Sequence, residues 1–230
     1  QSERFTKDVD FSTPEPYTRS AEDEFRRALE HALVAAPETL GYDLVCRIQK
    51  FDPQPGRDKT YVTLQLTIGY AQVGTPSYKR LLAGECTDIV GLDYSYSESI
   101  PEIETIQIDE EGMLCVYGLS TLVGEKLRAL LQQPIRRRTR RQDVYDLKLL
   151  LDTQPQLQDQ MTKARVLATL VAKCEEREFH ATATSFDNPE VRRLALLEYA
   201  TLATELPEGK LPPFDASFTV VSEYYRNLPW

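Results

Sequence analysis

The chain has 230 residues, of which 41% are hydrophobic, and its formal net charge is −9. A chain of this length can bury a sizeable core, in one large or two small domains, without disulfide or metal staples. The acidic balance argues against a general nucleic-acid coat protein or a binder of anionic membranes, but it leaves room for a local basic site. The sequence has neither a long apolar run nor a secretory signal, so we expect a cytoplasmic protein that does not span a membrane.

The residues that most often bind soft metals are scarce. Four cysteines, at positions 46, 86, 115 and 174, match no zinc or redox spacing, and we interpret them as buried thiols. Histidine occurs only at His31 and His180. A site for a hard metal ion must therefore be built from carboxylates.

The pattern of the first half of the chain predicts both strands and a helix. Residues 7–12 alternate, with Val9 and Phe11 on one face, which is typical of a half-buried strand. Ser20 is expected to cap a helix whose apolar stripe includes Phe25 and Leu29. Further strands are expected at 42–51 and 59–70, which would form a hairpin, and at 92–97 and 104–108.

From about residue 113 the apolar period changes to 3.6, which is typical of helices. Helices are expected around 119–130, 144–151 and 161–174, after an Asn188 cap, and over 215–226. We therefore predict an α+β half, residues 1–115, followed by a helical half, residues 116–230.

A pair of acids on the first strand is the first candidate for chemistry. Asp8 and Asp10 stand two positions apart, so on a strand they point to the same side. Two such carboxylates repel each other unless a cation lies between them, and Mg²⁺ prefers oxygen ligands. Asp93, on the polar face of a later strand, could add a third carboxylate, with Asp88 as its competitor. The alternative is that all of these acids are solvated surface groups.

A second candidate lies between positions 125 and 146. Lys126 sits on an otherwise apolar helix, and Asp143 and Asp146 share a helix face because they are three residues apart. Arg136, Arg137, Arg138, Arg140 and Arg141 form the one concentrated positive stretch of this acidic chain. Lysine and arginine both suit phosphate oxygens, although a solvated basic linker is equally compatible with the pattern.

Tyrosines form a third group of candidates. Tyr94 and Tyr96, and the pair Tyr224 and Tyr225, could stack on nucleic-acid bases. Because the chain has twelve tyrosines, we favour packing in the core or at its rim.

These pieces resemble a known family. Residues 4–12, RFTKDVDFS, resemble the R-F-S-x-D-[IL]-D-F-S segment of the AbiEii/AbiGii toxin-family nucleotidyltransferases. Residues 124–130, GEKLRAL, resemble the family's A-E-K-L-x-A-L, and residues 92–96, LDYSY, resemble its intervening strand. Residues 141–147, RQDVYDL, resemble R-x-x-D-L-Y-D-L with one residue fewer between Arg and Asp. The resemblance covers about residues 4–150.

The resemblance implies a polymerase-β-like nucleotidyltransferase core with a mixed sheet, followed by a helical C-terminal region. It implies Mg²⁺ as cofactor, an NTP as substrate, and an RNA, such as tRNA, or a protein as acceptor. It further implies that the chain is the toxin of a bacterial toxin–antitoxin or phage-defence pair, with a cognate antitoxin as partner.

The resemblance also implies a role for individual residues. Asp8 and Asp10, with Asp93 as a third ligand, would hold the metal ion and the triphosphate. Lys126, Thr6 and Arg141 would contact the nucleotide, and either Asp143 or Asp146 would activate the attacking hydroxyl or orient the site.

One family element has no counterpart in the sequence. Family members carry a Gly-Ser or Gly-Gly-Thr element about ten residues before the paired acids, where backbone N–H groups cradle the triphosphate. This chain begins seven residues before Asp8. We expect either a chain shortened upstream of Gln1 or a catalytically degenerate member that only binds. A plain RNA-binding protein that uses the arginine run is a third interpretation, disfavoured by the overall acidity.

Overall fold

The computed structural model describes residues 8–59, 61–108 and 112–230, and the chain forms two compact units. One unit ends at Ile100 and the other runs from Pro101 to Trp230. From the apolar periods alone, this boundary was expected near residue 115. The later hairpin belongs with the helices instead, because its strands lead directly into the first of them and Gly118 N donates to Glu102 O at 3.0 Å.

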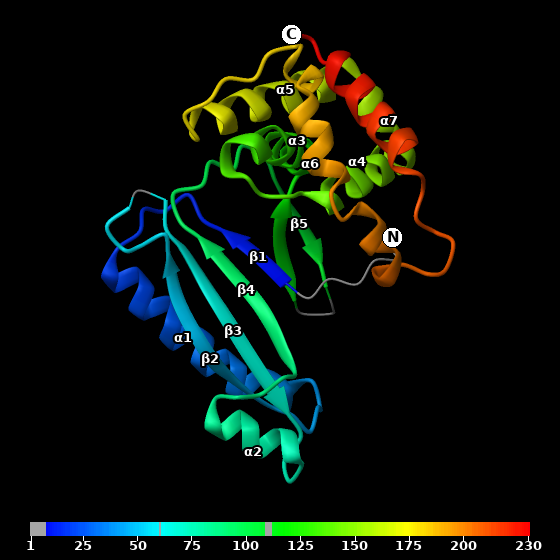
Figure 1. Ribbon diagram of the computed structural model, residues 1–230. Helices are drawn as coiled ribbons and strands as arrows, with labels where there is room; N and C mark the ends of the chain where they lie inside the picture. Colours follow the sequence, from blue (N-terminus) through cyan, green and yellow to red (C-terminus); the bar gives the residue numbers. More distant parts are fainter. Residues whose placement is uncertain (1–7, 60, 109–111) are drawn as a thin grey trace. The chain divides into compact units, whose positions relative to one another are not determined.

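The first unit contains a four-stranded mixed sheet (Figure 1). Its strand order is β1-β4-β3-β2, formed by β1 (Asp8–Ser12), β4 (Ile89–Ser95), β3 (Thr63–Ala71) and β2 (Val45–Gln54). β1 runs parallel to β4, while the other neighbours are antiparallel. The predicted β2–β3 hairpin and the predicted α+β class with a mixed sheet are confirmed.

Helix α1 (Arg19–Thr39) covers the apolar face of this sheet (Figure 1). The rings of Phe25 and Tyr94 lie 4.2 Å apart, so the helix contacts β4 directly. The cap of α1 is Thr18 and not Ser20, because Thr18 has the extended backbone and its hydroxyl accepts from Ala21 N at 3.0 Å. The opposite face of the sheet carries the polar residues of β1 and β4.

A short helix, α2 (Pro76–Ala83), lies at the end of the β2–β3 hairpin and was not predicted. Thr75 caps its start, and Gly84, with φ of 76°, ends it. Leu81 packs with Ala71 and Cys86 in a small cluster of its own.

The second unit begins with a two-stranded hairpin and continues as helices (Figure 1). The hairpin consists of β5 (Ile103–Gln107) and β6 (Met113–Tyr117). The helices are α3 (Leu119–Arg136), α4 (Arg141–Thr153), α5 (Gln160–Glu175), α6 (Pro189–Leu196) and α7 (Phe214–Arg226), with 3₁₀ turns η1 (Pro155–Gln158), η2 (Ser185–Asp187) and η3 (Tyr199–Glu205). The five predicted helices are confirmed, whereas β6 occupies residues where the helical period was expected to begin.

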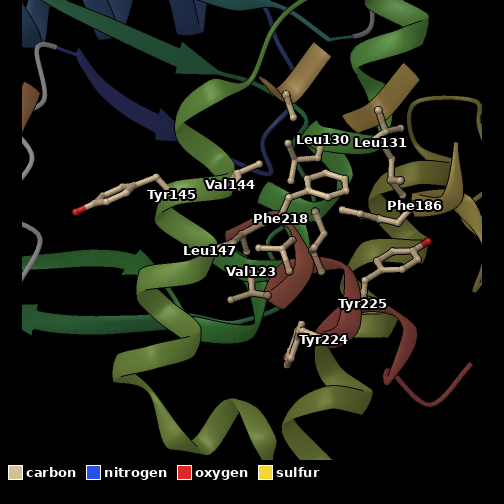
Figure 2. Close-up of a cluster of buried hydrophobic side chains, with 14 of the residues drawn as sticks. Val123, Leu130, Leu131, Val144, Tyr145, Leu147, Phe186, Phe218, Tyr224 and Tyr225 are labelled. Atoms are coloured by element: carbon tan, nitrogen blue, oxygen red, sulfur yellow. The ribbon is translucent and has the colours of Figure 1, made fainter. Parts of the chain in front are cut away.

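The core of the second unit is formed by side chains that converge from α3, α4 and α7 (Figure 2). Tyr225 is fully buried, and its hydroxyl donates to Thr182 O at 2.6 Å. Tyr224 is buried beside it, and Tyr96 is buried in the first unit. Tyr94 is half-buried against the first unit's core, so the interpretation that these tyrosines pack in the core or at its rim is confirmed.

The cysteines agree only in part with the expectation. Cys86 and Cys174 are buried and Cys46 is half-buried, but Cys115 is exposed. Cys115 lies opposite the exposed Thr105 in the β5–β6 hairpin, where a two-stranded sheet covers little surface. Over the described residues, the structure has no helix that is both long and apolar enough to span a membrane.

Candidate functional site

The polar face of the first unit's sheet brings two of the predicted carboxylates together. β1 and β4 pair in parallel with Asp10 directly opposite Asp93. Asp88 precedes β4 and accepts from Ser77 Oγ at 3.1 Å, so it is not in this register. Between the two alternatives considered for a third acid, the sheet therefore aligns Asp93 with the pair on β1.

Asp8 stands one step along the same face, opposite Gly91. A Cβ added at Gly91 would lie only 2.3 Å from Asp8 Oδ1, so the carboxylate of Asp8 occupies the space that a side chain on β4 would need. The glycine therefore allows Asp8 to lean from β1 over β4.

A row of polar side chains extends across all four strands. Asp10, Asp93, Gln65 and Asp52 occupy successive paired positions on β1, β4, β3 and β2. Gln65 Nε2 donates to Asp93 Oδ2 at 3.3 Å, and therefore restrains that carboxylate from the side away from Asp10. Gln65 was not singled out from the sequence. Its place on the polar side of an alternating strand was visible, but its alignment with Asp93 depends on a pairing between distant segments.

The donor set of this face suits a hard divalent cation, because Mg²⁺ prefers carboxylate oxygens. Asp10 and Asp93 occupy paired positions on adjacent strands, and the carboxylate of Asp8 lies over the neighbouring position. Within residues 8–59, 61–108 and 112–230, no three His, Cys, Asp or Glu side chains are already grouped closely enough to hold a metal ion. The residues fit the ion in kind and on one face, and they would have to draw together around it.

A second cluster lies in the second unit and joins α3 to α4. Lys126 Nζ lies 3.0 Å from Asp143 Oδ1 and 2.8 Å from Asp146 Oδ2. The two acids share a face of α4 because they are three residues apart. The side chains are 20%, 7% and 14% exposed for Lys126, Asp143 and Asp146, so the cluster is largely removed from water.

Burial and charge act in opposite directions on Lys126. Burial lowers the pKa of its ammonium, but the two adjacent carboxylates raise it by more, so the pKa lies above its ordinary value. Lys126 is therefore a permanent cation at neutral pH. Asp143 Oδ2 is buried and accepts no hydrogen bond within the part of the chain that the structure describes. A buried carboxylate oxygen without a donor is costly and is a candidate acceptor for a substrate proton.

Arg141 and Thr6 were both expected to contact the nucleotide, and the structure describes only Arg141. Arg141, at the start of α4, forms an ion pair with Glu205 of η3 at 2.7 Å and also contacts Thr201. Its guanidinium is therefore already engaged within the second unit, and its proposed contact with a nucleotide stays a prediction. Thr6 lies outside the described residues.

An α+β fold with a mixed sheet followed by C-terminal helices is consistent with a nucleotidyltransferase-like fold. Comparison with protein-family models agrees: the chain matches the nucleotidyl transferase AbiEii toxin family of type IV toxin–antitoxin systems over residues 1–220. The chain belongs to this family. The match extends well beyond residue 150, where the resemblance of the motifs ends. A search of the curated proteins found no match.

Family membership establishes the class of activity. The chain is a nucleotidyltransferase of the kind that acts as the toxin in a type IV toxin–antitoxin system. A nucleotide substrate and a cognate antitoxin follow from that membership.

Proposed function

We propose that this protein transfers a nucleotide from an NTP to a hydroxyl group of an RNA, such as tRNA, or of a protein, with Mg²⁺ as cofactor. The observation that carries the proposal is the placement of Asp10 opposite Asp93 on adjacent strands, with Asp8 on the same face. Two aligned carboxylates on the polar face of a sheet repel each other, and a divalent cation relieves that repulsion. We assign Asp8, Asp10 and Asp93 as its ligands.

The reaction forms a bond from the acceptor oxygen to the α-phosphorus of the NTP and breaks the bond to the β-phosphate, so pyrophosphate leaves. A divalent ion held by the carboxylates would neutralise charge on the phosphate oxygens and on the leaving group. We also assign Lys126 to the phosphates: its carboxylate neighbours keep it protonated, and its charge would act on the phosphates once it left those pairs.

The acceptor hydroxyl must lose its proton during the transfer. Either Asp143 or Asp146 receives it or orients the group that does. Asp143 is the more deeply buried and retains an oxygen without a hydrogen-bond donor among the described residues, which favours Asp143 as the acceptor.

The biological setting is part of the same proposal. We infer that the transfer takes place in the cytoplasm of a bacterium, where the protein serves as the toxin of a toxin–antitoxin or phage-defence pair and is held in check by its antitoxin. Family membership supports this setting, because the family consists of nucleotidyl transferase toxins.

The test is nucleotide transfer measured with matched variants. The protein is incubated with each α-³²P-labelled NTP, Mg²⁺ and total tRNA, and labelled RNA and labelled protein are separated. We expect transfer by the unmodified chain and its loss in Asp10→Asn. Asp52→Asn is the control, since Asp52 lies in the same row of the sheet but beyond Gln65, paired with Lys50 at 3.3 Å.

Two results would contradict the proposal. The first is equal transfer by the unmodified chain and Asp10→Asn. The second is tight binding of MgATP without transfer to RNA or protein, which would favour a non-catalytic binding module.

A further inference from the structure

Four arginines occupy the corner between α3 and α4, and we call Arg136, Arg137, Arg138 and Arg140 the arginine corner. Arg136 is the last residue of α3, and α4 begins immediately after Arg140. The side chains of the first three are exposed and Arg140 is partly exposed. Four positive charges therefore lie within five consecutive positions of a chain whose net charge is −9.

The charges of the arginine corner are not neutralised within the part of the chain that the structure describes. None of its four guanidiniums forms an ion pair with a described carboxylate. Other arginines of the same unit do: Arg141 pairs with Glu205, Arg192 with Asp215 and Arg226 with Asp187.

The cations of the corner also repel one another. Burial, and then the guanidiniums of Arg177, Arg128, Arg138 and Arg140, lower the pKa of Arg136. Like charges held this close raise the free energy of the unbound surface, and an anion placed among them lowers it.

Hydrogen bonds from a buried glutamine hold the backbone of the arginine corner in place. Gln133 is almost fully buried, and its Oε1 accepts from Arg140 N at 2.8 Å. Its Nε2 donates to Leu130 O at 3.1 Å and to Val191 O at 3.3 Å, which ties the corner to α3 and α6. Arg137 ends α3 in the left-handed conformation, with φ of 52°. The arginines therefore project from an anchored turn, which lowers the entropy lost when a ligand orders them.

We propose that the arginine corner binds the phosphate backbone of the RNA acceptor. This inference rests on the proposed function, and it selects RNA over protein as the acceptor. Guanidinium forks match phosphate oxygens in pairs, and an RNA strand presents a phosphate at every nucleotide, so several of the four arginines can be engaged at once. On an acidic protein, an unpaired basic corner also fixes where a polyanion can approach.

The corner is also well placed with respect to the chemistry of its own unit. Arg140 is three residues before Asp143, and both belong to the turn that starts α4. RNA bound at the corner is therefore held next to the first turn of the helix that carries Asp143 and Asp146.

The test is equilibrium binding of a fluorescein-labelled RNA hairpin with a single-stranded 3′ end, measured by anisotropy without NTP. The test variant is the triple change Arg136→Gln, Arg138→Gln and Arg140→Gln. The control is the triple change Arg165→Gln, Arg192→Gln and Arg193→Gln, which removes the same charge from arginines of the same unit that are paired with Glu102, Asp215 and Glu190. Circular dichroism verifies that both variants are folded.

We expect the test variant to bind the hairpin at least about tenfold more weakly than the unmodified chain, and the control to change affinity by much less. The dependence of log Kd on log salt should also become shallower, by about 0.7–0.9 for each phosphate that the variant no longer binds. Equal affinity of the test variant and the unmodified chain would overturn the inference, as would displacement of the hairpin by polyglutamate at equal charge.

The readout is independent of catalysis. Corner-dependent RNA binding without nucleotide transfer would uphold the inference while contradicting the proposed function. Asp10-dependent transfer together with corner-independent RNA binding would do the reverse.

Discussion

At the residue scale, the pKa of Lys126 reports the balance between burial and its two carboxylate partners. The carboxylates of Asp143 and Asp146 raise the pKa of Lys126 against the effect of burial, so the ion pairs stabilise the fold at neutral pH. Because the pKa is raised, this stabilisation is present below the ordinary pKa of lysine and is lost as the pH rises through the raised value.

We predict that Asp143→Asn lowers the pKa of Lys126. In this variant only Asp146 remains to raise the pKa against the lowering effect of burial. Titration of the lysine side chain by NMR measures the change. Asp152→Asn is the control, because Asp152 lies on the same helix but pairs with Lys148. An unchanged pKa of Lys126 in Asp143→Asn would show that the two carboxylates do not determine the charge of the lysine.

The space above Gly91 gives a second prediction at this scale. In Gly91→Ala the new Cβ would lie 2.3 Å from Asp8 Oδ1, so the carboxylate of Asp8 must swing away. The displaced atom is the end of a flexible side chain, so we expect little loss of stability. Nucleotide transfer should fall by about tenfold to a hundredfold, because a misplaced ligand disrupts alignment. Steady-state kinetics measures the transfer and urea unfolding the stability, and an unchanged rate of transfer would refute the prediction.

Residue types were easier to predict than their partners. The paired acids on β1 were identified from strand alternation, and the shared face of Asp143 and Asp146 from their spacing of three residues on a helix. The contact from Gln65 to Asp93 was not, because the β3–β4 register joins segments 28 residues apart and no local pattern encodes it. The ion pair of Arg141 with Glu205 escaped prediction for the same reason.

At the element scale, a partly buried ion pair joins α1 to the loop between β2 and β3. Glu22 lies in the first turn of α1 and accepts from Arg57 at 2.7 Å and also from the Tyr17 hydroxyl. The Arg57 hydrogen bond, acting against burial, lowers the pKa of Glu22. A lowered pKa means that this stabilisation is present above the ordinary pKa of glutamate and is lost as the pH falls through the lowered value.

We therefore predict that Arg57→Gln destabilises the protein by about 1–3 kcal/mol at neutral pH, because it removes the guanidinium Nε and Nη2 donors from the buried carboxylate of Glu22. The difference from the unmodified chain should shrink once the pH is low enough to protonate Glu22. Urea unfolding at several pH values measures this. Arg26→Gln breaks an exposed pair with Glu30, so it should cost at most about 0.5 kcal/mol. Equal costs for the two variants would contradict this prediction.

Helices and strands are predicted correctly from apolar periodicity where the periodic segment is long. The helices of the second unit were predicted because several turns of apolar residues mark each of them, and Asn188 caps α6 as expected, accepting from Glu190 N at 2.9 Å. Short elements were missed or displaced. β6 has five residues and α2 has eight, and in such segments a few apolar positions fit either period.

At the scale of the whole molecule, the two candidate clusters belong to different units. The carboxylates of Asp8, Asp10 and Asp93 lie on the sheet of the first unit, and Lys126 with its two acids lies among the helices of the second. The sequence indicated both clusters and the α+β class, but it placed the division at residue 115 because apolar periods do not reveal which neighbour a hairpin packs against.

The proposed chemistry depends above all on the carboxylates of β1 and β4 holding a divalent ion for the nucleotide. The most direct measurement is the binding of Mn²⁺, as a paramagnetic substitute for Mg²⁺, to the full chain with a non-hydrolysable NTP analogue, followed by electron paramagnetic resonance. We predict saturable binding by the unmodified chain and by Asp52→Asn, and at least about tenfold weaker binding by Asp10→Asn and by Asp93→Asn. Equal Mn²⁺ affinity in all four proteins would contradict the proposal.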